Sequence, residues 1–218
     1  MYVIAGATGR VGSATARSLL VAGATTRVLI RRPATADAWQ EQGAETRLAA
    51  LGDRDALGDA LEGCSGFFVL LPFDLTVDDL DSYADTLIAA IAGAVTDQRV
   101  PHVVMLSSGG ADLVEGTGPI TGLHRLERAL RETGTTVTAL RSGHFQEKVS
   151  DVLAVVRDAG IYPVFAASGD VPHSMVATHD LGTVAAQSLL LPPATSEAVD
   201  IIGPAYTERE VAAALGDA

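Results

Sequence analysis

Three glycines, Gly6, Gly9 and Gly12, follow the first apolar segment of the chain at intervals of three residues. Glycine permits a tight turn and lets the backbone approach a phosphate group closely. A helix that begins directly after such a turn offers free N–H groups and the positive end of its dipole to a pyrophosphate. The spacing differs from the Gly-x-Gly-x-x-Gly of many dehydrogenases, but its place between a strand and a helix predicts a dinucleotide-binding turn. The alternative is a glycine-rich turn that binds nothing.

Two arginines, Arg31 and Arg32, end the second apolar segment. An NAD-specific site usually has an acidic residue at this place, which accepts the ribose hydroxyls. The sequence has no acidic residue between Gly12 and Asp37. Arginine pairs instead with a 2′-phosphate, and Arg10 in the glycine turn is expected to approach from the other side. This pattern predicts NADP(H) rather than NAD(H), the alternative being two solvated surface arginines.

Other segment ends add candidate site residues. Asp53 follows the third expected strand, where it either meets the adenine amine or caps the next helix. Leu71 and Pro72 end the fourth strand, where the backbone of such folds passes close to the nicotinamide ribose. No group of histidines and carboxylates has the spacing of a metal site, so no metal is expected.

Short apolar segments and segments with helical spacing alternate up to about residue 142. Strands are expected at residues 2–5, 27–30, 45–50, 67–71, 102–106 and 136–140. Helices are expected at residues 13–22, 34–42, 53–61, 78–95 and 123–131. This alternation predicts parallel strands joined by right-handed helical crossovers, with Gly12 letting the first helix pack against the first strand.

The rhythm changes after residue 142. A helix is expected at residues 146–157, followed by irregular chain, a second helix at 180–191 and a late strand at 199–202. We therefore predict an α/β fold, a Rossmann-type doubly wound parallel sheet with a small C-terminal substrate lobe. The predicted division is residues 1–144 for the NAD(P)-binding domain and 145–218 for the lobe, with a late strand that can rejoin the sheet.

Composition bounds the partners. The formal net charge of −12 disfavours binding to nucleic acid, but it allows a small anionic cofactor at a local positive site. The single cysteine, Cys64, excludes an internal disulfide and fits a reducing compartment. The longest apolar run, residues 67–72, is too short to cross a bilayer, and no secretory leader is recognisable. We therefore expect a soluble, cytoplasmic protein with a small-molecule partner, and the sequence leaves the oligomeric state open.

A set of motifs in this order resembles the NmrA-like branch of the atypical short-chain dehydrogenases/reductases. The matching segments are residues 6–12, 29–32, 52–55, 68–72, 106–111, 124–127, 140–145, 176–182 and 202–204. That family contains NADPH-dependent quinone and isoflavone-type reductases, and also non-catalytic redox sensors that bind regulators. Its members commonly continue past the segment that here ends at Ala218, so the lobe is expected to be either truncated or a short natural form.

The resemblance implies roles for individual residues. The pyrophosphate side would be held by Gly6, Thr8, Gly9, Arg10, Val11 and Gly12, and the 2′-phosphate by Arg31. Leu71 and Pro72 would flank the nicotinamide ribose, and the nicotinamide would be bordered by Gly143, His144 and Phe145. Ser107 falls where related enzymes have the serine of their catalytic set. His124 falls where they have the lysine that binds the ribose hydroxyls.

The chain departs from the superfamily in lacking its Tyr-x-x-x-Lys pair. Its one lysine, Lys148, has His144 four residues before it, and Ile120 stands four residues before His124. In the pair, the lysine helps to lower the tyrosine pKa for proton transfer, so ordinary alcohol or ketone chemistry is not expected. Hydride transfer to a quinone asks less of an enzyme acid, because solvent can protonate the product. His124, His144 and Tyr162 are the candidate acids.

Two functions fit these observations. The favoured one is an NADPH-dependent oxidoreductase that reduces a quinone or related conjugated carbonyl, with His124, Ser107 and Tyr162 as its catalytic residues. The alternative is a non-catalytic NADP(H)-sensing regulator that binds a protein partner. A nucleotide-sugar epimerase is disfavoured by the missing pair. Apolar residues of the lobe suit a flat aromatic acceptor and equally suit core packing, namely Val152, Val155, Val156, Tyr162, Phe165 and Met175.

Overall fold

The computed structural model describes residues 1–164 and 167–216. Seven strands form one parallel sheet in the order β3-β2-β1-β4-β5-β6-β9. Their bounds are β1 (Tyr2–Ile4), β2 (Thr26–Ile30), β3 (Glu45–Leu48), β4 (Gly66–Leu70), β5 (His102–Ser108), β6 (Thr136–Ser142) and β9 (Glu197–Ile201). The predicted Rossmann-type α/β fold is confirmed. The late strand β9 pairs with β6.

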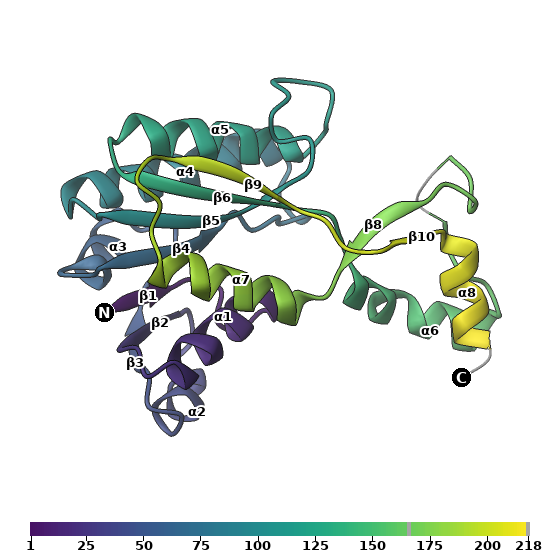
Figure 1. Cartoon of the computed structure of the whole chain (residues 1–218), viewed down its shortest axis with the longest axis horizontal. Coiled ribbons are helices and arrows are strands. Elements are labelled where there is room, and N and C mark those ends of the chain that lie inside the picture. The colour runs from purple at the N-terminus through teal and green to yellow at the C-terminus, as the bar shows by residue number, and fades with distance from the viewer. Residues whose placement is uncertain (165–166, 217–218) are drawn as a thin grey trace.

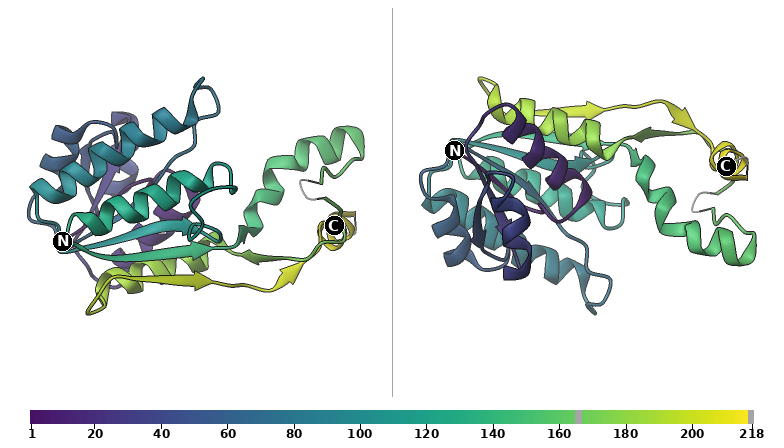
Figure 2. Two further views of the ribbon diagram at one scale, coloured as in Figure 1. Left: turned by 90° about the horizontal axis from the view of Figure 1, so that it is seen from above. Right: turned by 90° about the horizontal axis from the view of Figure 1, so that it is seen from below.

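Helices cover both faces of this sheet (Figures 1 and 2). One face carries α1 (Arg10–Val21), α2 (Ala36–Gln40) and α7 (Thr178–Leu190), and the other carries α3 (Arg54–Leu61), α4 (Leu80–Asp97) and α5 (Ile120–Glu132). Each layer has its own apolar core. Phe68 of β4 packs with Leu19 and Leu181 on the first face, and Phe67 packs with Ile91 and Leu126 on the second. Alternate strand residues therefore face opposite layers, as a doubly wound sheet requires.

A smaller sheet stands beyond one end of the main sheet, as Figure 1 shows. It consists of β7 (His144–Phe145), β8 (His173–Val176) and β10 (Ala205–Tyr206), where β8 is parallel to β7 and antiparallel to β10. Helices α6 (Val149–Ala159) and α8 (Glu208–Gly216) accompany it. We call this part the small lobe. Helix α7 and strand β9 come between β8 and β10 in sequence, but they lie with the main sheet.

A polar cluster lies inside the small lobe. The carboxylate of Glu208, which is only 6% exposed, accepts a hydrogen bond of 2.7 Å from the Tyr162 hydroxyl. His173 Nε2 lies 3.7 Å from the other Glu208 oxygen, and the ring of His173 meets that of His144 edge-on at 5.3 Å. Burial and the bond to Glu208 together raise the pKa of Tyr162 to about 12. This tyrosine therefore holds its proton at neutral pH.

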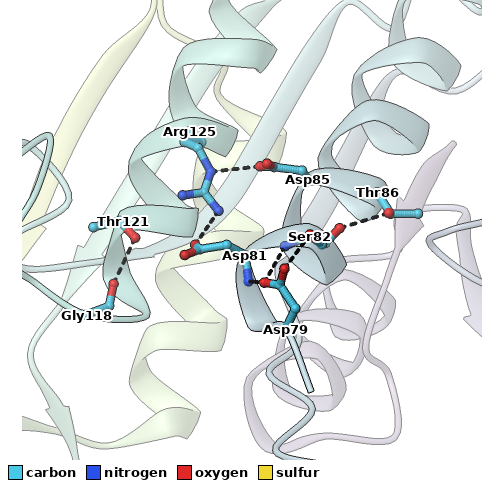
Figure 3. A network of polar contacts seen from close by, with 8 residues as sticks. All are labelled: Asp79, Asp81, Ser82, Asp85, Thr86, Gly118, Thr121 and Arg125. Carbon is cyan, nitrogen blue, oxygen red and sulfur yellow. Dashed lines mark hydrogen bonds and ion pairs between the residues drawn. The ribbon is translucent and has the colours of Figure 1, made fainter. Parts of the chain in front are cut away.

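Helices α4 and α5 are joined by a polar network at the start of α4 (Figure 3). The Arg125 guanidinium of α5 lies 2.8 Å from carboxylate oxygens of both Asp81 and Asp85 on α4. Asp79 caps α4 by accepting hydrogen bonds from the N–H groups of Asp81 and Ser82. The capping stabilises the start of α4, and the ion pairs fix its first turns against α5.

Several elements differ from those expected. The helix expected at residues 34–42 is a 3₁₀ turn (Pro33–Thr35) followed by the short α2, and the one expected at 146–157 begins with a 3₁₀ turn (Gln146–Lys148). Strands β7, β8 and β10 and helix α8 were not predicted. Two of these strands have two residues each, too few for a pattern to show. No helix within the described residues is both long and apolar enough to span a membrane.

Candidate nucleotide-binding site

A cleft of about 310 Å³ opens where β1 and β4 lie side by side. The chain leaves β1 toward β2 on one side, whereas β4 lies on the other, so this is the switch point of the sheet, the usual ligand site of open α/β folds. Predicted site residues that line the cleft are Gly6, Thr8, Gly9, Arg31, Arg32 and Pro72. Residues that sequence reasoning missed are Thr35, Leu51, Tyr83 and Leu87, among others.

The glycine turn shapes one end of the cleft. Gly6 has a φ of +67°, and a Cβ atom there would lie 2.5 Å from a methyl carbon of Leu70. A Cβ atom on Gly12 would overlap the carbonyl group of Gly6. Helix α1 begins directly after the turn, with Gly9 as its N-cap and without a side chain that caps it. The first N–H groups of α1 therefore lie next to the glycine turn and have no capping side chain. Val11, in the same turn of the helix, is buried.

Arg31 and Arg32, which follow β2, also line the cleft, and both side chains are exposed. Neither forms an ion pair with a carboxylate of residues 1–164 or 167–216. An acidic residue does stand nearby: hydrogen bonds from Thr76 lower the pKa of Asp74, and the charge of Arg31 contributes less. Thr35 also lines the cleft, and its hydroxyl donates to the carbonyl of Arg32 over 2.8 Å. Two positive groups thus line the cleft with capacity for an anion.

Arg10 contacts the small lobe. Its Nη2 donates to Ser150 Oγ and to Asp151 Oδ1, each over 2.8 Å, and both partners belong to α6 of the small lobe. Arg10 is not among the residues that line the cleft. The approach of Arg10 to a 2′-phosphate stays a prediction, and the structure shows a different partner.

Asp53 and Leu71 have structural contacts. Asp53 is the N-cap of α3, and its Oδ1 accepts a 3.1 Å hydrogen bond from the N–H of Ala56. Of the two roles expected for Asp53, the capping contact is the one present. Leu71 is buried in the core beneath α4 and α5, whereas the next residue, Pro72, lines the cleft.

Ser107 and His124 lie outside the cleft, and Ser107 contacts a buried carboxylate, Glu127, that sequence reasoning missed. The Ser107 hydroxyl donates to Glu127 Oε1 over 2.6 Å. Arg141 donates to the same carboxylate through Nε (3.1 Å) and Nη2 (2.9 Å). His124 bonds the carbonyl of Ala111 through Nδ1 (2.9 Å) and lines a polar pocket of about 400 Å³ together with Glu127 and Arg141. The catalytic roles of Ser107 and His124 stay predictions.

The residues expected to border the nicotinamide lie where the main sheet meets the small lobe. Gly143 follows β6 directly, and His144 and Phe145 form β7. Burial and the neighbouring His173 lower the pKa of His144, which favours its neutral form. Tyr162 does not join Ser107 and His124, because its hydroxyl is bound to Glu208 inside the lobe.

The apolar residues expected to form a wall of the lobe are not equivalent. Met175 is buried, whereas Val155 is 47% exposed, and Phe165 lies outside the described residues. Among the residues that the structure describes, no three histidines, cysteines or carboxylates are grouped to hold a metal ion.

Comparison with known proteins places the chain in a family. A family model described as NAD(P)H-binding matches residues 6–190, which include the glycine turn, the arginine pair and α7. The chain belongs to this NAD(P)H-binding family. Its cofactor is therefore a nicotinamide dinucleotide, as predicted, and the match extends past residue 144 but ends before β10 and α8 of the small lobe.

Individual relatives agree with this assignment. The NAD(P)H-binding chain is 28% identical over 219 residues to an NAD(P)H azoreductase of Xenophilus azovorans, covering 100% of this chain and 73% of the relative. Its fold is similar to triphenylmethane reductase of Citrobacter sp. complexed with NADP(H), with a TM-score of 0.84, 20% identity and coverage of 99% and 75% of the two chains. It is equally similar to an Escherichia coli NADPH-dependent quinone oxidoreductase complexed with NADPH, with a TM-score of 0.84, 24% identity and coverage of 100% and 75%. The resemblance to NmrA-like atypical short-chain dehydrogenases/reductases is confirmed.

The side chains of the cleft fit such a dinucleotide. Gly6 and Gly12 let the backbone turn tightly before the uncapped start of α1, as a pyrophosphate site requires. Apolar side chains, Leu51 and Leu87, and the ring of Tyr83 also line the cleft, as suits an adenine ring. The lining of the cleft thus combines a glycine turn, apolar side chains and a cationic pair.

Proposed function

We propose that this chain is an NADPH-dependent reductase that transfers a hydride to a quinone or a related conjugated carbonyl compound. The observation that carries the proposal is the cleft, which has an uncapped helix start and two arginines that form no ion pair with a described carboxylate. The relatives described above are by name an azoreductase, a triphenylmethane reductase and a quinone oxidoreductase. Their named substrates are conjugated molecules, which supports an acceptor of the same kind.

The preference for NADPH over NADH rests on the two arginines that line the cleft. A 2′-phosphate carries the negative charge that Arg31 and Arg32 can pair with, and NADH lacks this group. No acidic residue of the described chain lines the cleft to accept the ribose hydroxyls of NADH. The two arginines therefore favour the phosphorylated nucleotide.

The proposed reaction asks little acid catalysis of the protein. Reduced nicotinamide supplies the hydride, and a proton from solvent completes the product. The protein binds the nucleotide in the cleft and orients the acceptor at the junction of sheet and lobe. The Ser107 hydroxyl already donates a hydrogen bond to Glu127, so we assign Ser107 a positioning role at the end of β5. His124 has a ring nitrogen, Nε2, without a hydrogen bond to a described residue, and we propose that it orients the nicotinamide ribose.

The test combines binding with turnover. NADPH and NADH are titrated into the protein by tryptophan or nucleotide fluorescence, and NADPH oxidation is then followed at its absorbance maximum with a quinone, an azo dye and a triphenylmethane dye. The proposal expects tighter NADPH binding and a faster oxidation with at least one quinone. If only the azo dye accelerated NADPH oxidation, the chain would still be a reductase, but its acceptor would be an azo compound and not a quinone. Failure of both nucleotides to bind would overturn the proposal.

A non-catalytic NADP(H) sensor is the second candidate. It is favoured by the missing Tyr-x-x-x-Lys pair and by the engagement of the Ser107 hydroxyl with a buried carboxylate. Under this alternative NADPH binds well, yet no quinone, enone or aldehyde accelerates its oxidation. A protein partner would then be retained on the immobilised chain in a manner that depends on the ratio of NADPH to NADP⁺.

A further inference from the structure

Arg10 connects the glycine turn to the small lobe. It is the first residue of α1, and its guanidinium pairs with Asp151, the third residue of α6, at 2.8 Å. Lys148 lies 3.2 Å from the other oxygen of the same carboxylate. Hydrogen bonds from Arg10 and Lys148 lower the pKa of Asp151, so this carboxylate is charged at neutral pH. An ion pair thus joins the anion-binding end of α1 to the start of α6.

Asp151 does not depend on Arg10 to stay at this place. Both carboxylate oxygens of Glu147 accept hydrogen bonds from the N–H of Thr178 (2.9 and 3.0 Å), and the Thr178 hydroxyl adds a third bond of 2.7 Å. Thr178 is the first residue of α7, which packs along α1. These bonds anchor the segment before α6 to the main body. The Asp151 carboxylate therefore remains beside Arg10 when the guanidinium changes its partner.

The Arg10 guanidinium stands where two anions compete for it. The first turn of α1 has no capping side chain and no acidic residue, so its N–H groups are the expected site of the pyrophosphate. Arg10 begins that turn, and one guanidinium cannot give its best bidentate geometry to a carboxylate and a phosphate together. Because the Arg10 and Asp151 side chains are 42% and 45% exposed, their pair is weak enough to exchange.

We propose that Asp151 lowers the affinity of the site for dinucleotides by competing with the pyrophosphate for Arg10. The inference rests on the nucleotide site of the proposed function. It differs from the role of Arg31 in one measurable respect. NADPH and NADH both carry the pyrophosphate, so the competition at Arg10 affects them equally, whereas the 2′-phosphate distinguishes them.

Asp151→Asn is the decisive variant, because it removes the competing charge and keeps the shape of the side chain. We expect the dissociation constants of NADPH and NADH to fall by a similar factor, about two- to fivefold, and the gain to shrink as salt is raised. Asp158→Asn is the matched control. Asp158 lies on the same helix, is exposed and has no ion pair with a described residue, so its loss should leave both constants unchanged.

A double variant links the effect to Arg10. In an Arg10→Ala background, Asp151→Asn should change neither dissociation constant. All these constants are measured by equilibrium titration, a readout that needs no turnover. Unchanged or weaker binding in Asp151→Asn would overturn the inference, as would a gain that persists without Arg10. In both cases wild-type binding survives, whereas failure of the proposed function removes nucleotide binding from the wild type itself.

Discussion

Arg31→Ala tests the role of the arginine pair in the cleft. The substitution removes a positive group that lines the cleft and has no carboxylate partner among the described residues. No acidic side chain is therefore left without its ion pair when Arg31 is shortened. The change in nucleotide affinity then reports on the contact of Arg31 with the ligand, and the folding of the protein should be unaffected.

The size of the effect follows from the type of contact. A hydrogen bond to a charged group contributes about 1.5–3 kcal/mol, which corresponds to about a 10- to 150-fold change in the dissociation constant. Arg31 is exposed, and solvent weakens an exposed ionic contact, so we expect the lower end for NADPH. NADH lacks the 2′-phosphate, and its dissociation constant should change less than twofold, within the scatter of about 0.4 kcal/mol seen for surface substitutions.

The assay is a titration of both nucleotides into wild type, Arg31→Ala and the control Arg47→Ala. Arg47 is also exposed and lies on the adjacent strand β3, but it is paired with Glu45 at 2.7 Å and does not line the cleft. The control therefore removes the same charge without removing the proposed contact. Equal losses for NADPH and NADH in Arg31→Ala would refute the assignment of this residue to the 2′-phosphate, and so would an equal loss of NADPH affinity in Arg47→Ala.

Three further predictions concern stability. Gly12→Ala forces a methyl group against the Gly6 carbonyl and should lower the free energy of unfolding in urea by about 1–3 kcal/mol. The control Gly58→Ala, whose Cβ would meet only ordinary contacts, should not lower it. Similar losses for both variants would contradict the packing argument. Tyr162→Phe leaves the buried carboxylate of Glu208 with one donor fewer and should lower the free energy of unfolding by about 1–3 kcal/mol without slowing NADPH oxidation. Slower turnover at unchanged stability would instead identify this hydroxyl as the proton donor. Burial lowers the pKa of His102, so below about pH 6.5 the unfolded chain binds more protons than the folded one. The free energy of unfolding should therefore fall as the pH drops below about 6.5, by at most about 1.4 kcal/mol per pH unit. His102→Gln should flatten this dependence below about pH 6.5, and an unchanged slope would assign the dependence to other groups.

The sequence by itself determined the sheet, the glycine turn and the place of the arginine pair. These features depend on local properties: the spacing of apolar residues, the backbone freedom of Gly6 and the position of Arg31 directly after a buried strand. Parallel strands end on the same edge of a sheet. Residues that follow β1 and β2 therefore had to line one cleft, although they are separated in sequence.

Only the tertiary structure decided the partners of the polar side chains. Arg10 meets Asp151 across 141 positions, and Ser107 meets Glu127 across 20. Neither pairing leaves a mark in the spacing of the residues, because each depends on how a helix is placed against another part of the chain. Tyr83 belongs to the same class: it lines the cleft because α4 is held at its first turns by the network in Figure 3. A side chain finds its charged partner through the packing of whole elements, and that packing is set by apolar contacts distributed over the entire chain.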